Sequence, residues 1–166
     1  MTGGGKWGMV DSVEAEGSQA PVVAKFTGER RHTLDPKGRL ILPSKHRERL
    51  EEGMVMTAWL DRCLTVLPGE DWGRVLVKLR KLSSTNAQHR RFARIVLAMA
   101  HEDTPDRQGR VTIPAHLRDF AHLDKDVTVV GADDHLELWN TQSWAEYRFD
   151  GLDEFADINE SLGGVL

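Results

Sequence analysis

The chain has 166 residues, of which 40% are hydrophobic and 29% charged, and its formal net charge is -4. These values are typical of a soluble globular protein with one ordinary domain or two small ones, and they exclude a collagen, a coiled coil and a wholly disordered chain. The single cysteine, Cys63, excludes an intramolecular disulfide and a thiolate metal cage. Because no apolar run approaches the roughly 18 residues of a membrane span and no secretory signal is present, we expect a cytoplasmic protein without a membrane partner.

The beginning of the chain is its least patterned part. Residues 1–24 contain five glycines and three acidic residues and show no sustained periodicity. Such a composition is typical of unstructured chain termini. We therefore predict a flexible N-terminal extension and begin the fold at residue 25.

A nine-residue motif occurs twice in the chain. Residues 35–43 read DPKGRLILP and residues 106–114 read DRQGRVTIP, at an offset of 71 residues. At the same offset Arg47 corresponds to Arg118. The sequence therefore contains one small module in two copies. With one residue inserted, further apolar positions correspond: Leu64, Val66 and Trp72 with Leu136, Leu138 and Trp144.

Each motif begins with the residues of a tight turn. The Asp, Pro and Gly of residues 35–38 suit the first, second and fourth positions of a type I turn, and glycine readily adopts the left-handed conformation that completes a hairpin. We therefore predict that each motif is the tip of a β-hairpin whose return strand begins at Arg39 or Arg110. Alternation along the first return strand places Leu40 on one face and Arg39 and Ile41 on the other.

The other elements follow from hydrophobic spacing and from proline and capping signals. A short helix is expected after each motif, and two further strands after each helix. Helical spacing over residues 71–82 and a capping asparagine, Asn86, predict two helices between the modules. The predicted short helices are 44–50 and 115–121, and the predicted strands are 54–59, 64–67, 127–131 and 136–139.

These elements define an α+β fold. A module of about 45 residues is marginal as a folding unit, so the two copies are expected to bury their apolar faces against each other. We predict a pseudo-twofold β-barrel whose two modules are joined by a helical hairpin and followed by a C-terminal helix. The predicted boundaries are 1–24 for the extension, 25–71 for the first module, 72–97 for the linker, 98–141 for the second module, and 142–166 for the C-terminal helix and acidic tail.

Charge is segregated along the chain. Residues 25–49 contain eight Lys or Arg against three acidic residues, and residues 74–94 contain seven against none. Residues 150–166 contain five acidic residues and no basic one. A basic N-terminal half is consistent with a nucleic-acid partner despite the negative net charge. The basic residues of the linker helices alone would equally suit an ordinary solvated face.

The arginines after the turns are the best candidates for DNA contact. An exposed arginine can donate two parallel hydrogen bonds to guanine or phosphate, and a β-ribbon fits the major groove. The same arginines could instead pair with the turn aspartates and shape the loop. The first copy is favoured because its sequence neighbours are basic, whereas the second has Gln108 and acidic residues nearby. The predicted DNA-binding residues are Arg31, Asp35, Lys37, Gly38 and Arg39 in the first copy and Asp106, Gly109 and Arg110 in the second.

Signals for catalysis or for a cofactor are weak. Seven histidines are scattered without the spacing of metal ligands. Cys63 belongs to no Cys-His signature, and neither a phosphate loop nor a dinucleotide fingerprint occurs. We therefore expect no metal, no cofactor and no enzymatic activity.

Taken together, the motifs resemble the MraZ family, whose members consist of two AbrB-like swapped-hairpin domains. The resemblance extends from about Phe26 to Trp144 and includes both Asp-x-x-x-Arg signatures. Two signatures at this separation are highly specific, whereas one alone would also fit AbrB-like regulators or antitoxins. The other matching residues are Phe26-x-Gly28, Leu82-Ser83-Ser84, and Gly131 followed by Leu136-Glu137-Leu138-Trp139.

The resemblance implies a transcriptional regulator that binds short direct repeats in double-stranded DNA upstream of the division and cell-wall gene cluster, including its own promoter. It also implies a homo-oligomer in the form of a closed ring, association with the nucleoid, and DNA contact through residues 35–39 and 106–110. The chain departs from the family pattern in its long N-terminal extension and in Gln108 of the second copy. Two alternatives remain open: an AbrB-like antitoxin or other swapped-hairpin regulator, and a structural oligomer that binds acidic partners.

Overall fold

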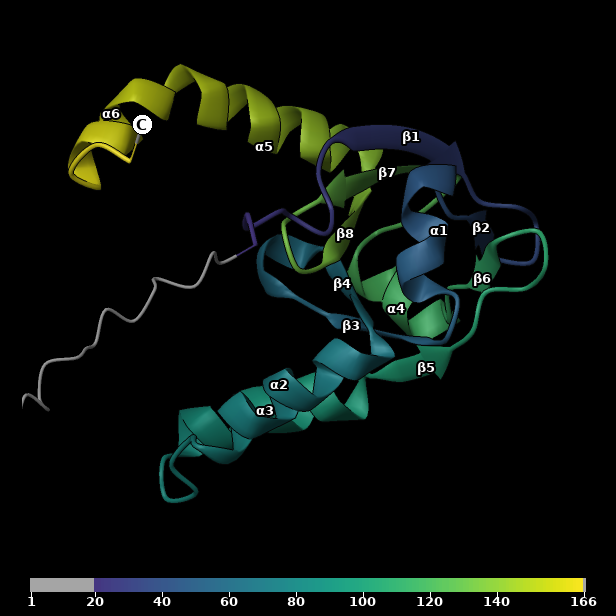
Figure 1. Cartoon of the computed structure of the whole chain (residues 1–166). Helices are drawn as coiled ribbons and strands as arrows, with labels where there is room; N and C mark the ends of the chain where they lie inside the picture. The colour runs from purple at the N-terminus through teal and green to yellow at the C-terminus, as the bar shows by residue number, and fades with distance from the viewer. Residues whose placement is uncertain (1–19, 166) are drawn as a thin grey trace, which may run out of the picture.

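The computed structural model describes residues 20–165, which form eight β-strands, six α-helices and one short 3-10 helix (Figure 1). The elements of the first repeat and the linker are β1 (Glu29–Thr33), β2 (Arg39–Ile41), α1 (Ser44–Leu50), β3 (Met54–Ala58), η2 (Leu60–Arg62), β4 (Leu64–Pro68), α2 (Gly69–Arg80) and α3 (Ala87–Ala98). Those of the second repeat and the C-terminal segment are β5 (His101–Asp103), β6 (Arg110–Thr112), α4 (Ala115–Phe120), β7 (Asp126–Gly131), β8 (Leu136–Asn140), α5 (Thr141–Asp153) and α6 (Phe155–Ser161).

Most of the predicted helices and strands form close to their expected positions. The helix α1 has the predicted bounds, and the side chain of Asn86 caps α3 by accepting hydrogen bonds from the backbone amides of Gln88 and His89. The C-terminal segment forms two helices, α5 and α6, where one was expected. Most of the predicted N-terminal extension lies outside the described residues, and residues 20–24 have no regular secondary structure.

Six strands form one antiparallel sheet in the order β1-β7-β8-β4-β3-β5. This order reads the same from either edge when each strand is replaced by its counterpart in the other repeat. At the centre β4 pairs with β8, and Thr65 lies opposite Glu137. The remaining strands, β2 and β6, form a two-stranded ribbon in which Leu40 lies opposite Val111. The pair β4–β8 and the pair β2–β6 each join a strand of one repeat to a strand of the other. Both sheets therefore contain strands from both repeats.

The strands on either side of each turn do not pair with each other, which corrects the predicted hairpins. Instead β1 pairs with β7, β5 pairs with β3, and β2 pairs with β6. The turns themselves are closed as expected, because the amide of Gly38 donates to the carbonyl of Asp35, and that of Gly109 donates to the carbonyl of Asp106. Each turn therefore carries the chain from the large sheet to the ribbon, where the strand meets its partner from the other repeat.

The α+β class is confirmed, whereas the predicted barrel is not. The strands of residues 20–165 form two separate sheets and do not close into one hydrogen-bonded barrel. In Figure 1, α1 and α4 lie against the body of the molecule, while the pairs α2–α3 and α5–α6 extend away from it. No helix in this part of the chain is long and apolar enough to cross a membrane.

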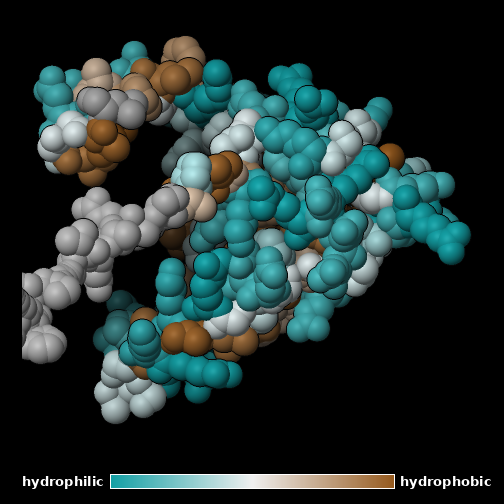
Figure 2. Space-filling model, in the orientation of Figure 1, coloured by the Kyte–Doolittle hydropathy of each residue, from teal (hydrophilic) through white to brown (hydrophobic). Residues whose placement is uncertain are grey.

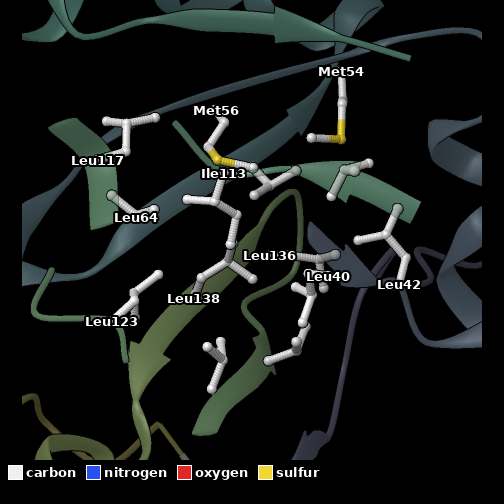
Figure 3. Packing of buried hydrophobic residues seen from close by; sticks show 14 of the residues in the cluster. Leu40, Leu42, Met54, Met56, Leu64, Ile113, Leu117, Leu123, Leu136 and Leu138 are labelled. Atoms are coloured by element: carbon white, nitrogen blue, oxygen red, sulfur yellow. The ribbon is translucent and has the colours of Figure 1, made fainter. Parts of the chain in front are cut away.

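The core lies between the ribbon and the large sheet. Leu40 and Val111, which face each other across the ribbon, belong to the same buried cluster as Leu136 and Leu138 of β8 (Figure 3). Ile41, the next residue along β2, is 46% exposed. The predicted alternation along β2 is therefore confirmed, with the apolar face turned inward and the face of Arg39 turned outward.

Replacing Leu40 by Ala should lower the free energy of unfolding by about 2–5 kcal/mol, because a fully buried side chain is lost and a cavity remains. The neighbouring change Ile41→Ala is the matched control, since that side chain is half exposed, and it should cost less than about 1 kcal/mol. Urea unfolding followed by circular dichroism measures both values. Equal losses for the two variants would contradict the inward orientation of Leu40.

Candidate nucleic-acid interface

A single carboxylate organises the first turn. Oδ1 of Asp35 accepts hydrogen bonds from the backbone amides of Lys37 and Arg39, both at 2.8 Å, and Oδ2 accepts one from Nε of Arg39 at 2.6 Å. Gly38 has a φ of +76°, in the left-handed region that favours glycine. These contacts fix both the loop and the base of the arginine side chain that follows it.

The second turn repeats this arrangement. Oδ1 of Asp106 accepts from the backbone amides of Gln108 and Arg110, both at 2.9 Å, and Oδ2 accepts from Nε of Arg110 at 2.7 Å. The aspartate–arginine pair that the sequence left open is thus present in both turns. Only Nε is engaged in these pairs: within residues 20–165 the Nη atoms of the two arginines have no hydrogen-bond partner. Pairing with the turn aspartates therefore leaves the Nη donors of both arginines available for a ligand.

Hydrogen bonding also sets the ionisation of the two turn aspartates. The backbone amide of Arg39 is the largest cause that lowers the pKa of Asp35, and the backbone amide of Arg110 has the same effect on the pKa of Asp106. Both carboxyl groups therefore stay ionised at neutral pH, where they hold the arginines by charge-assisted hydrogen bonds.

The ribbon brings both arginines to one outer face. Arg39 lies opposite Thr112, and Ile41 lies opposite Arg110. Because the intervening residue of each strand is buried, these four residues point away from the core. The offset between the arginines is two residues, or about 7 Å along a strand. Figure 1 shows both turn loops at the same side of the molecule, beside β2 and β6.

Ile41 and Thr112 complete this outer face and were not among the predicted site residues. Alternation had already placed Ile41 on the side of Arg39, but its position opposite Arg110 depends on the pairing of β2 with β6. A period-two pattern in the sequence does not identify the partner strand, so this part of the site was not predictable.

An arginine from each repeat packs against the turn of the other repeat. A Cβ on Gly38 would lie 2.9 Å from Cζ of Arg118, and a Cβ on Gly109 would lie 2.5 Å from Nε of Arg47. The Nε atoms of these two arginines also donate to backbone carbonyls just after β2 and β6, both at 3.0 Å. Neither glycine has room for a side chain, and each turn is braced by the opposite repeat.

The other predicted DNA-binding residues lie in two places. Lys37 is exposed within the first turn, next to Arg39. Arg31 instead lines a hollow between β1, β7 and α5, together with Thr141 and Ala145. The structure thus groups Lys37 with the two turn arginines and leaves Arg31 at a hollow that contains no turn residue.

The exchange of strands also changes the electrostatic surroundings expected from sequence. Arg47 of the first repeat lies at the second turn, whereas Asp103 of the second repeat accepts a hydrogen bond from the amide of Thr112, opposite Arg39. Lys45 lies beside Gly28, at the far end of β1 from the first turn. The basic setting predicted for the first turn alone is therefore shared with the second.

The described part of the chain offers little for metal binding or for thiol chemistry. Within residues 20–165 no group of three His, Cys, Asp or Glu side chains could hold a metal ion. Cys63 is fully buried, and this burial is the main cause that raises the pKa of its thiol far above the ordinary value, so the sulfur stays protonated. Nδ1 of His135 lies 2.7 Å from Oδ1 of Asp134, and this contact belongs to the turn between β7 and β8.

The fold and the ribbon define a swapped-hairpin protein built from two repeats. A family model described as "MraZ protein, putative antitoxin-like" matches this chain twice, over residues 25–95 and 96–160. The chain therefore belongs to the MraZ family.

Several relatives share most of their length with this chain, and each is named transcriptional regulator MraZ. The protein of Salinispora arenicola is 44% identical over 137 residues, which cover 82% of this chain and 96% of the relative. The protein of Thermobifida fusca is 43% identical over 142 residues, covering 85% and 99%. That of Heliobacterium modesticaldum is 42% identical over 137 residues, covering 82% and 96%.

Replacing Gly109 by Ala should lower the free energy of unfolding by at least about 1 kcal/mol, because its φ of +77° strains an alanine and the new Cβ would meet Arg47. The matched control is Gly151→Ala in α5, where no atom lies within 4 Å of the added Cβ. That change should raise stability by roughly 0.5–1 kcal/mol, as expected for a helical Gly→Ala change. Urea unfolding tests both, and a neutral Gly109→Ala variant would show that the turn is not braced.

The lowered pKa values of Asp35 and Asp106 predict a specific loss of stability in acid. A carboxyl group with a depressed folded-state pKa stabilises the fold above its unfolded pKa of about 3.9, and this contribution disappears as the pH falls through the folded value. The double variant Asp35→Asn/Asp106→Asn should therefore be less stable than the wild type at pH 6, and the difference should shrink below about pH 4. Urea unfolding across this pH range measures the difference; a constant gap would contradict the prediction.

Proposed function

We propose that this protein regulates transcription by binding double-stranded DNA sequence-specifically through the outer face of the β2–β6 ribbon. The observation that carries the proposal is the pair of arginines, Arg39 and Arg110, which lie on that face, are held by aspartates at Nε, and keep their Nη atoms for a ligand. The names of the relatives, transcriptional regulator MraZ, support the same function.

The chemistry of the ribbon suits base readout in the major groove. That groove admits a two-stranded β-ribbon, and arginine donors match the two acceptors on the edge of guanine. Ile41, which is half exposed opposite Arg110, supplies an apolar contact for the methyl group of thymine. Lys37 adds a positive charge beside Arg39 for the phosphate backbone.

We propose that both turns bind DNA, with the larger share at the first. The first turn carries Lys37 where the second carries Gln108, which favours Arg39 as the main reader. The second turn gains a cationic neighbour, Arg47, from the other repeat. The bracing of each turn by the opposite repeat keeps the two arginines in a fixed relation, which reduces the entropy lost on binding.

The proposed targets are short direct repeats upstream of a division and cell-wall gene cluster, including the promoter of the protein's own gene. The proposed working form is a homo-oligomeric closed ring, associated with the nucleoid in the cytoplasm. Both proposals rest on membership of the MraZ family. A ring suits direct repeats because the first contact raises the effective concentration for the next and increases avidity by roughly 10²- to 10⁴-fold.

Arg39→Ala should abolish specific binding to promoter DNA in a gel-shift assay, and Arg110→Ala should weaken it by about 10-fold or more, since each good bidentate contact contributes about 1–3 kcal/mol. Arg49→Ala is the matched control, because it removes an exposed arginine of α1 outside both turns and should leave specific binding within about twofold.

Three further measurements accompany this experiment. Size exclusion should show that the oligomer of each variant is unchanged. Scrambled DNA of the same length separates sequence-specific from general electrostatic binding. Each lost phosphate contact should reduce the slope of log affinity against log salt by about 0.9. Wild-type binding by Arg39→Ala would disprove the assignment of the ribbon, and equal affinity for scrambled DNA would favour a protein that binds acidic partners in general.

A further inference from the structure

The helices α2, α3, α5 and α6 bury almost none of their apolar side chains. In α2 the only buried residue is Asp71, in α3 the only one is Val96, and α5 and α6 bury none. By contrast, the short helices α1 and α4 bury Leu50 and Leu117 in the core. Amphipathic helices are usually stabilised by packing of their apolar face. The first half of α5 packs on β8, where Trp144 and Tyr147 lie against Trp139, but large apolar side chains remain exposed on all four helices.

The apolar side chains on these helices are large and accessible. We call the pair α2–α3 the linker arm and the pair α5–α6 the C-terminal arm. Figure 2 shows hydrophobic side chains on the linker arm and over the C-terminal arm. The exposed fractions are 48% for Val77, 40% for Phe92 and 47% for Ile95 on the linker arm, and 73% for Phe149, 57% for Leu152, 56% for Phe155 and 44% for Ile158 on the C-terminal arm.

The two arms carry opposite charge. Residues 74–94, which span most of the linker arm, contain seven basic residues and no acidic one. Residues 150–166, which include the end of α5 and all of α6, contain five acidic residues and no basic one. Within residues 20–165 no ion pair joins one arm to the other. The complementary charges are therefore not satisfied inside a single chain.

We propose that the C-terminal arm of one copy docks on the linker arm of a second copy, with apolar side chains at the centre of the contact and opposite charges around it. Polar rims around an apolar centre are the usual arrangement of protein interfaces. This proposal names the contact surface of the homo-oligomer proposed above and is independent of DNA binding.

Such a contact is heterologous, because each copy contributes a different surface on each side. A heterologous contact leaves one arm free at each end of a chain of copies, so assembly continues until it closes into a ring or forms a filament. In Figure 1 both arms extend on the side opposite the turn loops beside β2 and β6. Docking through the arms therefore leaves the ribbon accessible in every copy.

Charge-reversed variants test this pairing. The acid-reversed variant carries Asp150→Lys, Asp157→Lys and Glu160→Lys on the C-terminal arm, and the base-reversed variant carries Lys78→Glu, Arg91→Glu and Arg94→Glu on the linker arm. All six residues are exposed, so the fold of each variant should persist. The wild type should run on size exclusion with light scattering as a multiple of the 18.7 kDa chain. Each variant alone should be a monomer, with self-association weakened about 100-fold or more by like-charge contacts.

The decisive sample is an equimolar mixture of the two variants. When the two variants alternate in an assembly, the basic C-terminal arm of the acid-reversed variant meets the acidic linker arm of the base-reversed variant. The unchanged acidic C-terminal arm of the base-reversed variant meets the unchanged basic linker arm of the acid-reversed variant. Every contact therefore joins opposite charges. The mixture should therefore regain the wild-type mass. A wild-type monomer, variants that assemble alone, or a mixture that stays monomeric would each overturn the proposal, and a dimer would indicate like arms in contact.

A third variant tests the apolar part of the contact. Phe149→Ser/Phe155→Ser removes two exposed aromatic side chains from the C-terminal arm without changing its charge. Circular dichroism should show a folded chain, and light scattering should show a monomer; a wild-type mass would overturn the apolar contact. None of the arm variants alters a turn residue, so the two proposals can fail separately. Wild-type DNA binding by Arg39→Ala with an intact oligomer would refute the proposed function alone. DNA binding by a monomeric wild type would refute the arm contact alone.

Discussion

The fold depends on the pairing of β2 with β6, because in this ribbon a strand of the first repeat pairs with a strand of the second. Leu40 and Val111 face each other across that pair and point into the shared core. A single repeat would leave both the ribbon strand and its apolar face without a partner, and a unit of this size is marginal on its own. Fusing two copies in one chain makes the exchange intramolecular and lowers its entropic cost.

The same pairing produces the surface proposed to bind DNA. Antiparallel register fixes which outward residues are neighbours, and it sets Arg39 and Arg110 diagonally on one face. The turn aspartates then restrict each guanidinium at Nε. An arginine restricted in this way loses less side-chain freedom on meeting a base edge or a phosphate. The hydrogen bonds that shape the loop therefore also prepare the arginine for binding, and the two roles do not exclude each other.

The sequence predicted the local structure but not which strands pair with each other. Turn chemistry predicted residues 35–38 as a turn, proline and spacing predicted α1, and alternation predicted the burial of Leu40, because each depends on residues a few positions apart. Strand exchange depends on contacts far apart in sequence, so the pairing of β1 with β7 was not predictable from local patterns. For the same reason, the sequence did not indicate that Arg47 of the first repeat lies at the second turn.

The negative net charge is reconciled with a nucleic-acid partner by the proposed contact between the arms. Much of the acidic excess lies in residues 150–166, and it is segregated from the turns. If the acidic arm is covered by the basic arm of a neighbour, the two charge clusters largely neutralise each other at the contact. The field that DNA meets then comes mainly from the ribbon and its surroundings, where Lys37, Arg39 and Arg110 lie. Net charge thus describes the whole chain, whereas binding depends on the face left exposed after assembly.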